Sequence, residues 1–251
     1  MTPFYFGASD RQLFGAYDPP ATGGRRAALI CQPWAREYLL AHPTLRHAAR
    51  SLSRAGWHAL RFDYSGTGDS AGSDHDVSLA QWQDDIRTAI RELQDISGVQ
   101  RIALIGLRLG GTLAAWVADG RSDVERLVLW DPVHDGLRHV NDLRRPVVPW
   151  REPAPRMELN RDEVVGAPLP EALRTEIESI SPAAFGTRLP RTLLLNTHDD
   201  ASAHAPLAAR LDGSDFSGEH APDVQVWREE WGRGGVGLAV RAVERMCAWL
   251  A

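Results

Sequence analysis

The sequence contains no lysine, so all 28 of its basic residues are arginines. The lysine amine is the side chain that forms Schiff bases with carbonyl substrates and with pyridoxal phosphate. Its absence excludes both kinds of chemistry by the protein itself. No other pattern indicates a cofactor, so we predict that none is bound.

Cysteine and long apolar runs are also scarce. The two cysteines, Cys31 and Cys247, lie near opposite ends of the sequence. No apolar run approaches the roughly 18 residues that span a bilayer. Residues 1–12 lack the basic start and apolar block of a secretory signal. We therefore expect a cytoplasmic protein with no membrane span and no structural disulfide.

An excess of positive charge is absent as well. The formal net charge is -5, the isoelectric point is near 6.0, and acidic residues interrupt the arginine-rich stretches. This balance argues against nucleic-acid binding. With 251 residues, 43% of them hydrophobic, the chain is long enough for one large core. We predict a single domain over residues 1–251. The sequence does not decide between a monomer and a homodimer.

Apolar runs that indicate strands alternate with segments that show helical spacing. Continuous apolar strands are typical of a parallel sheet covered on both faces, which places the chain in the α/β class. The expected strands are 4–8 and 12–18 as an antiparallel pair, then 26–31, 58–64, 101–107, 124–130, 192–197 and 224–229. The expected helices are 43–55, 79 to about 98, 109–119, 205–211 and 236–250.

The alternation breaks between residues 134 and 190. Prolines recur there, and only residues 170–180 show helical spacing. A segment this long without strands is typical of an insertion, and we expect a cap over the carboxyl edge of the sheet. Residues 63–70 form a separate glycine-punctuated loop, which we interpret as a tight structural turn because it lacks the Gly-Lys-Ser/Thr ending of a phosphate-binding loop.

The sequence Gly106-Leu107-Arg108-Leu109-Gly110 joins an expected strand to an expected helix. A Gly-x-Ser-x-Gly nucleophile elbow occupies this setting in serine hydrolases, with glycines where the turn is crowded. Here the middle residue is Arg108. A guanidinium cannot attack a carbonyl carbon, so this turn predicts a site without a serine nucleophile.

Five segments in order carry a family resemblance that covers nearly the whole chain. The chain resembles the α/β-hydrolases and, more narrowly, the exosortase A system-associated hydrolase type 2 group, whose members also have arginine at the elbow. The segments are Pro33-Trp34-Ala35-Arg36-Glu37, residues 63–72 (Asp-Tyr-Ser-Gly-Thr-Gly-Asp-Ser-Ala-Gly), residues 106–110, Leu129-Trp130-Asp131-Pro132-Val133 and Glu163-Val164-Val165-Gly166.

The resemblance implies a triad of nucleophile, acid and histidine in that chain order. The acid is retained as Asp199 or Asp200. The histidine is expected in the loop at residues 230–235, which has none. The nearest, His220, is expected to precede the last strand and to lie at the opposite edge of the sheet. Two of the three triad members are thus missing, which excludes ordinary serine esterase chemistry.

The expected oxyanion loop is also altered, since Cys31-Gln32-Pro33-Trp34 stands where related enzymes carry His-Gly. The N–H group of Leu109 remains a donor for an oxyanion. Cys31 is either a substitute nucleophile or a small apolar residue that ends a buried strand. We favour the second interpretation because no histidine is placed by the sequence to activate the thiol.

His134 and His198 follow expected strands at the edge where sites in such sheets form. Either histidine could serve as a general base near neutral pH, or be an ordinary surface residue. With Asp199 they are the candidate catalytic residues. A metal site is not expected, because His198-Asp199-Asp200 lacks the ligand spacing of a closed site.

Arg108 has two interpretations that are compatible. It forms an ion pair with Glu37, Asp131 or Asp199, or its planar fork binds a substrate carboxylate or phosphate. Either way it requires an anionic partner. The expected substrate-binding residues are Arg108, Leu109, Cys31, Gln32, Trp34, Glu37, Asp131 and Trp231.

Three hypotheses about function follow. The first is an enzyme of non-serine mechanism, in which Arg108 holds a small anionic molecule and His134 or His198 moves a proton in lyase, elimination or hydrolytic chemistry. The second is a pseudohydrolase retained for binding a ligand or a partner. The third is acyl transfer through Cys31.

Overall fold

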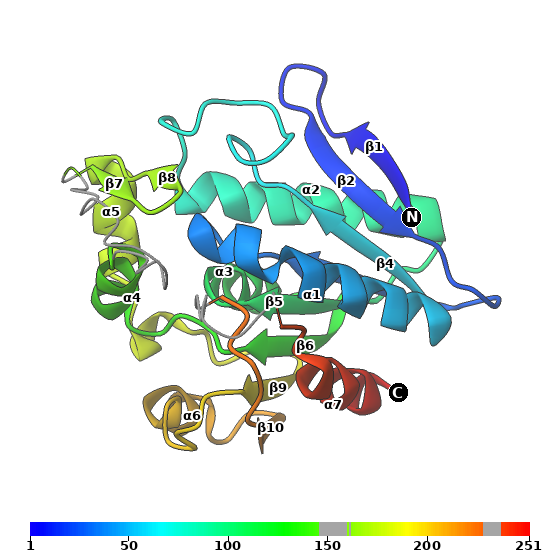
Figure 1. Ribbon diagram of the computed structural model, residues 1–251. Coiled ribbons are helices and arrows are strands. Elements are labelled where there is room, and N and C mark those ends of the chain that lie inside the picture. The colour runs from blue at the N-terminus through cyan, green and yellow to red at the C-terminus, as the bar shows by residue number, and fades with distance from the viewer. Residues whose placement is uncertain (146–159, 161, 228–236) are drawn as a thin grey trace.

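Eight strands form one twisted, mostly parallel sheet at the centre of the molecule (Figure 1). The computed structural model describes residues 1–145, 160, 162–227 and 237–251. The strand order is β1-β2-β4-β3-β5-β6-β9-β10. The first two strands form an antiparallel hairpin, and β2 pairs antiparallel with β4. The other six strands, β4, β3, β5, β6, β9 and β10, run parallel to one another. The strands are β1 (Thr2–Phe6), β2 (Leu13–Asp18), β3 (Arg26–Cys31), β4 (Trp57–Phe62), β5 (Ile102–Leu107), β6 (Val124–Trp130), β9 (Arg191–Asn196) and β10 (Phe216–His220).

Helices cover both faces of the sheet, as the continuous apolar strands predicted. Alternate strand residues enter two separate cores, so Leu29 packs on one side and Ile30 on the other. Helices α2 (Leu79–Ser97) and α3 (Leu109–Ala118) contribute to the first core, and α1 (Arg36–Arg54) and α7 (Val240–Leu250) to the second. This is the α/β-hydrolase fold that the resemblance implied.

Local sequence signals account for several element ends. Ser78 accepts a hydrogen bond from the N–H of Gln81 at 3.1 Å and begins α2, and Gly98 ends that helix in the left-handed conformation. By contrast, α1 begins seven residues before Pro43, which lies inside the helix and not at its start. The added turns are held by tertiary contacts, including the N–H of Arg36 with the carbonyl of Val165 at 3.1 Å.

The expected strand at 224–229 is wrong for its described part, residues 224–227. The strand is β10, which ends at His220 and pairs in parallel with β9. The mistake also reverses the expectation for His220, which lies at the carboxyl edge of the sheet and not at the opposite one. β10 is one of the two edge strands of the sheet and is only partly buried. Its sequence therefore needs no continuous apolar run, which is why the strand was missed.

Between residues 134 and 190 the described residues contain more structure than the one helix expected. They form α4 (Gly136–Leu143), a hairpin of β7 (Glu163–Val164) and β8 (Ala167–Pro168), α5 (Glu171–Glu178) and the 3-10 turn η1 (Pro182–Ala184). The carboxylate of Asp135 caps α4 by accepting from the N–H of Arg138 at 2.9 Å. These elements lie beyond the carboxyl ends of the central strands (Figure 1); that they act as a cap stays a prediction.

Both cysteines are free, as expected for a chain without structural disulfides. Among the described helices, none is long and apolar enough to cross a membrane. The helix α6 (Ala205–Leu211) lies next to the carboxyl edge and, with the loop before it, borders the site described below.

Candidate functional site

The turn between β5 and α3 forces Arg108 into a conformation that side chains rarely adopt, with φ at 55°. A Cβ atom on Gly110 would lie 2.3 Å from the carbonyl oxygens of Cys31 and Gln32, and one on Gly106 would lie 2.4 Å from the Cα of Gly111. The glycines therefore allow a turn too crowded for side chains. A non-glycine residue at such a turn costs about 1–3 kcal/mol, which is typical of functional sites.

Arg108 contacts four groups of the protein and also lines the cavity described below. Its Nε donates to Oε1 of Glu37 at 3.0 Å, and Nη1 donates to the carbonyl oxygen of Asp131 at 3.1 Å. Nη2 lies 3.4 Å from Nδ1 of His139, and the guanidinium carbon lies 5.5 Å from the ring centre of Trp227. Only 11% of the side chain is exposed. The ion-pair interpretation of Arg108 is therefore observed directly, with Glu37 as the partner.

Burial controls the protonation of the two groups beside Arg108. It raises the pKa of the Glu37 carboxyl, while the adjacent Arg108 cation acts to lower it. Burial and then the same cation hold the pKa of His139 well below its ordinary value of 6.5. His139 is thus neutral at pH 7, with Nδ1 accepting from Arg108. The carboxylate supplies the negative charge that this end of the site needs.

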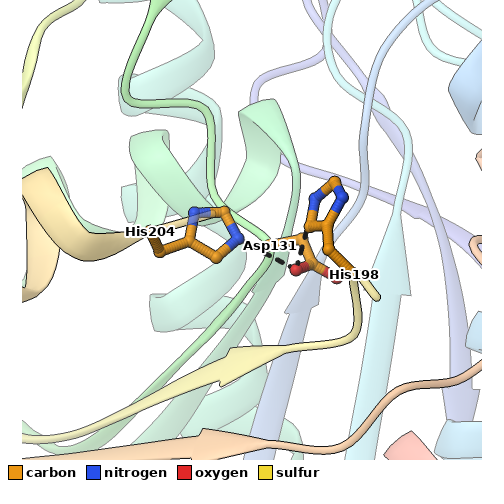
Figure 2. Close-up of side chains that lie close together, drawn as sticks. All are labelled: Asp131, His198 and His204. Carbon is orange, nitrogen blue, oxygen red and sulfur yellow. Dashed lines mark hydrogen bonds and ion pairs between the residues drawn. The ribbon is translucent and has the colours of Figure 1, made fainter. Parts of the chain in front are cut away.

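A second cluster forms around Asp131, which follows β6 and is fully buried with φ at 42°. Its carboxylate accepts from the backbone N–H of Thr197 at 3.0 Å and from the Thr197 hydroxyl at 2.5 Å. The Nε2 atoms of His204 and His198 lie 2.9 Å and 3.6 Å from Oδ1 (Figure 2). Asp131, and not Asp199, is therefore the carboxylate that meets the histidines.

A cavity of about 490 Å³ joins the two clusters. Arg108 and His139 of the first cluster line it, as do His134, His198 and His204 beside the second, and we call these two sets of residues the elbow end and the histidine end of the cavity. Nε2 of His134 lies 3.2 Å from the carbonyl oxygen of Ala203. Since a carbonyl only accepts, Nε2 carries the proton and Nδ1 keeps its lone pair. Burial lowers the pKa of His134, so the ring is neutral at pH 7.

Comparison with known families agrees with this architecture. The model of the family described as serine aminopeptidase, S33, matches residues 43–168, about half of the chain. The chain belongs to this family of α/β-hydrolases. No curated protein matches the sequence.

Solved structures share the fold of this S33-family chain at low sequence identity. Est1E from Butyrivibrio proteoclasticus with ferulic acid bound is 16% identical, with a TM-score of 0.68 over 98% of both chains. DcsB in complex with a substrate analogue is 15% identical, with a TM-score of 0.65 over 99% of this chain and 98% of that one. The bottromycin epimerase BotH in complex with bottromycin A2 is 18% identical, with a TM-score of 0.63 over the whole of both chains. At these identities the likeness establishes the fold alone.

Several expected site residues of the S33-family chain lie away from the cavity. Cys31 is fully buried at the end of β3, and burial raises the pKa of its thiol. Gln32 donates to Oδ1 of Asp63 at 2.9 Å, and the ring centre of Trp34 lies 5.8 Å from that of Trp82. These contacts are structural. Leu109 is buried at the start of α3, where its N–H group remains a candidate donor.

The structure gives no support for Asp199 as a catalytic residue or for Trp231 as a substrate-binding one. Asp199 is solvent-exposed and is not among the described residues that line the cavity. Trp231 lies outside the described residues, as does the whole loop at 230–235. The 63–70 loop does behave as a structural turn: Asp63 accepts from the N–H of Asp69 at 3.0 Å and its backbone carbonyl from the hydroxyl of Ser70 at 2.6 Å.

The residues that complete the site carry only a weak signal in the sequence. His139 lies on α4 and His204 precedes α6, so neither lies in the turn directly after a strand, where the catalytic motifs of this fold are found. Trp227 lies within the segment that was wrongly expected to be the last strand, and it follows β10. One signal was present: His198 and His204 flank a short polar segment directly before a helix, at the carboxyl end of a buried strand.

Proposed function

We propose that this protein is an enzyme of non-serine mechanism that binds and converts a small acyl- or carboxylate-bearing molecule in the cavity at the carboxyl edge. Arg108 anchors the anionic group, and a histidine moves the proton in lyase, elimination or water-mediated hydrolytic chemistry. Membership of the exosortase A system-associated hydrolase type 2 group is part of the same proposal. The observation that carries it is the cavity lined by Arg108 and by four histidines, three of them at the histidine end.

The elbow argues for a mechanism without a covalent serine intermediate. The turn geometry of a nucleophile elbow is retained, but it presents a guanidinium that already has an anionic partner in Glu37. The three contacts of Arg108 engage three of the five N–H groups of a guanidinium, and the side chain also lines the cavity. The remaining N–H groups are available to hold a substrate anion or its developing charge.

His134 is the histidine best suited to act as general base. The Ala203 carbonyl holds its proton on Nε2, which leaves the Nδ1 lone pair for a proton in the cavity. Burial keeps the ring neutral and so ready to accept. Nε2 of His198, the other expected base, lies 3.6 Å from the Asp131 carboxylate, so this nitrogen is directed at a protein group and not at a substrate.

The alternative function is a pseudohydrolase that binds a ligand or partner without turnover. The Arg108–Glu37 ion pair favours it, because that pair fills the space in which a nucleophile would act. The acidic residues that line the cavity do not decide between the two functions. Asp135 caps α4, and Asp142 pairs with Arg145 at 3.2 Å.

Binding and turnover of small carboxylates and carboxylic esters test the proposal. At least one compound should raise the melting temperature and be converted. Arg108→Lys keeps the charge but loses the fork, and it should weaken binding about 10- to 100-fold, the worth of a charge-assisted hydrogen bond. His134→Gln should lower kcat about 10²- to 10⁴-fold with little change in KM.

Arg87→Gln, which removes an arginine on the exposed face of α2, serves as the control and should change neither constant. Binding without turnover of any compound would favour the pseudohydrolase. Binding that is the same in Arg108→Lys as in the wild type would contradict the anchoring role.

A further inference from the structure

Three side chains with metal-ligating atoms meet at the histidine end of the cavity. Asp131 follows β6, His198 follows β9 and His204 directly precedes α6, so three separate segments supply them. We propose that Asp131, His198 and His204 bind a divalent transition-metal ion, with Zn²⁺ as its probe. The metal site extends the proposed function. It rests on that function in one respect, which is that the ion would hold an oxygen of the proposed substrate.

The distances suit one ion between the three atoms. Two ligands that each lie about 2.1 Å from a tetrahedral Zn²⁺ are about 3.4 Å apart. Oδ1 of Asp131 lies 2.9 Å from Nε2 of His204 and 3.6 Å from Nε2 of His198, values on either side of this separation. All three ligand atoms lie within 4.8 Å of one another. Small side-chain movements therefore bring the three atoms onto one ion.

The groups around the cluster hold its ligands in place. The N–H and hydroxyl of Thr197 both donate to the Asp131 carboxylate, which fixes its orientation. The side-chain oxygen of Asn196 accepts from the N–H of His198 at 2.9 Å and anchors the loop that carries this ligand. Such outer contacts orient metal ligands in known sites and tune their affinity.

Metal binding requires one proton to move within His204. Without the ion, Nε2 carries the proton that it donates to Asp131. To ligate the ion, Nε2 must present its lone pair, and the proton moves to Nδ1. The change gives up the hydrogen bond from Nε2 to Asp131, which the bonds of both atoms to the ion replace, and Nδ1, buried without a partner among the described residues, has no hydrogen bond to lose. The proton count of the ring is unchanged.

The cluster also leaves room for a fourth ligand on the cavity side. Asp131 is fully buried at the base, whereas His198 and His204 line the cavity. Three protein ligands with an open position are typical of catalytic zinc sites, and two nitrogens with one carboxylate suit that ion. A dipositive ion against one carboxylate leaves net positive charge. That charge would hold a substrate oxygen next to the anionic group that Arg108 anchors.

Cobalt and zinc titrations of the chelator-treated protein test the site. Co²⁺ should bind at one equivalent with the visible absorption of a four- or five-coordinate ion, and Zn²⁺ should displace it. His204→Gln and Asp131→Asn should each weaken Zn²⁺ binding about 100-fold or more, beyond the 10- to 100-fold typical of outer-contact changes. His198→Gln provides a third ligand variant at a more exposed position if Asp131→Asn does not fold.

Two histidine variants serve as controls. His134→Gln removes a histidine that lines the same cavity but lies outside the cluster, and His75→Gln removes an exposed one. Both should bind Zn²⁺ like the wild type. The absence of saturable binding, or equal binding by His204→Gln and the wild type, would overturn the proposal and leave a metal-free Asp131–His204 pair.

The two proposals can fail separately. A carboxylate that stabilises the chelator-treated protein through Arg108 would support the proposed function even where Zn²⁺ does not bind. Stoichiometric Zn²⁺ binding by the cluster, in a protein that no carboxylate or ester stabilises, would support the metal site and contradict the proposed function.

Discussion

The two ends of the cavity differ in the charged groups that meet there. At the elbow end, the Arg108 cation is paired with Glu37 and contacts the Asp131 carbonyl and His139. At the histidine end, the Asp131 carboxylate is held by Thr197 and meets the Nε2 atoms of His204 and His198. A cation therefore faces a carboxyl group at one end, and two ligating nitrogens face a carboxylate at the other.

This difference indicates a division of roles. A buried ion pair holds its partners in one arrangement but contributes little net stability, because desolvation offsets attraction. Histidines beside a carboxylate, in contrast, can bind an ion or move a proton. Both ends are placed by residues with positive φ, Arg108 at 55° and Asp131 at 42°. The strain at two neighbouring strand ends is consistent with one site that spans both.

The largest expected effect comes from breaking the elbow end. Glu37→Ala leaves the Arg108 cation buried without its carboxylate and should lower the free energy of unfolding by about 3–5 kcal/mol, measured by urea denaturation. The double variant Glu37→Leu, Arg108→Met removes both charges and should recover most of this loss. A loss below about 1 kcal/mol in Glu37→Ala would contradict the ion pair's role.

The histidine end should respond less. Thr197→Val removes the hydroxyl that donates to the Asp131 carboxylate and should cost about 1–3 kcal/mol, typical of a hydrogen bond to a charged group. Thr192→Val on β9, the strand that leads to Thr197, is the matched control, because the Thr192 hydroxyl donates to the neutral carbonyl of Pro190 at 2.7 Å. An equal loss in the free energy of unfolding for the two variants would show that the hydrogen bond to the Asp131 carboxylate stabilises the fold no more than one to a neutral carbonyl.

Acid should weaken the fold through His139. Its pKa in the folded protein lies well below 6.5, because it is buried and faces the Arg108 cation, with Glu37 as the only carboxylate in contact among the described residues. The unfolded chain therefore binds more protons, and stability is full above about pH 6.5 and falls as the pH drops below it.

The His139→Asn variant isolates this contribution. Asparagine keeps a polar acceptor beside Arg108 but does not titrate, so the free energy of unfolding should fall less steeply between about pH 6.5 and 4.5 than in the wild type. His134 and His42, whose pKa values are also lowered, remain in both proteins and cancel in the comparison. Parallel pH profiles would contradict a buried, neutral His139.

The smallest effect is expected at the thiols, which lie outside both ends of the cavity. Burial raises the pKa of Cys31, and it raises the pKa of Cys247 to about 11. Iodoacetamide at pH 8 should therefore label neither quickly in the native protein, as mass spectrometry would show, and Cys31→Ser should keep the turnover of the wild type. Rapid labelling of Cys31 with loss of turnover would instead support acyl transfer through this residue.

Much of the fold could be predicted because local patterns agree with the tertiary structure. β6 coincides with the expected strand at 124–130, and α2 begins at Leu79 as expected, directly after the N-cap residue Ser78. The predictions fail where tertiary contacts outweigh local signals. Helix α1 runs through Pro43 because its first turns are held by the β7–β8 hairpin, and β10 forms at an edge with little apolar pattern.

The sequence by itself determined the sheet except its last strand, the elbow with Arg108 and the lack of a histidine at residues 230–235, because each depends on residues that are neighbours in the chain. Only the tertiary structure decided that Glu37 is the partner of Arg108 and that Asp131 meets His198 and His204. These partners lie up to 73 residues apart. Their meeting depends on the parallel order of the strands, which brings distant strand ends to one edge of the sheet.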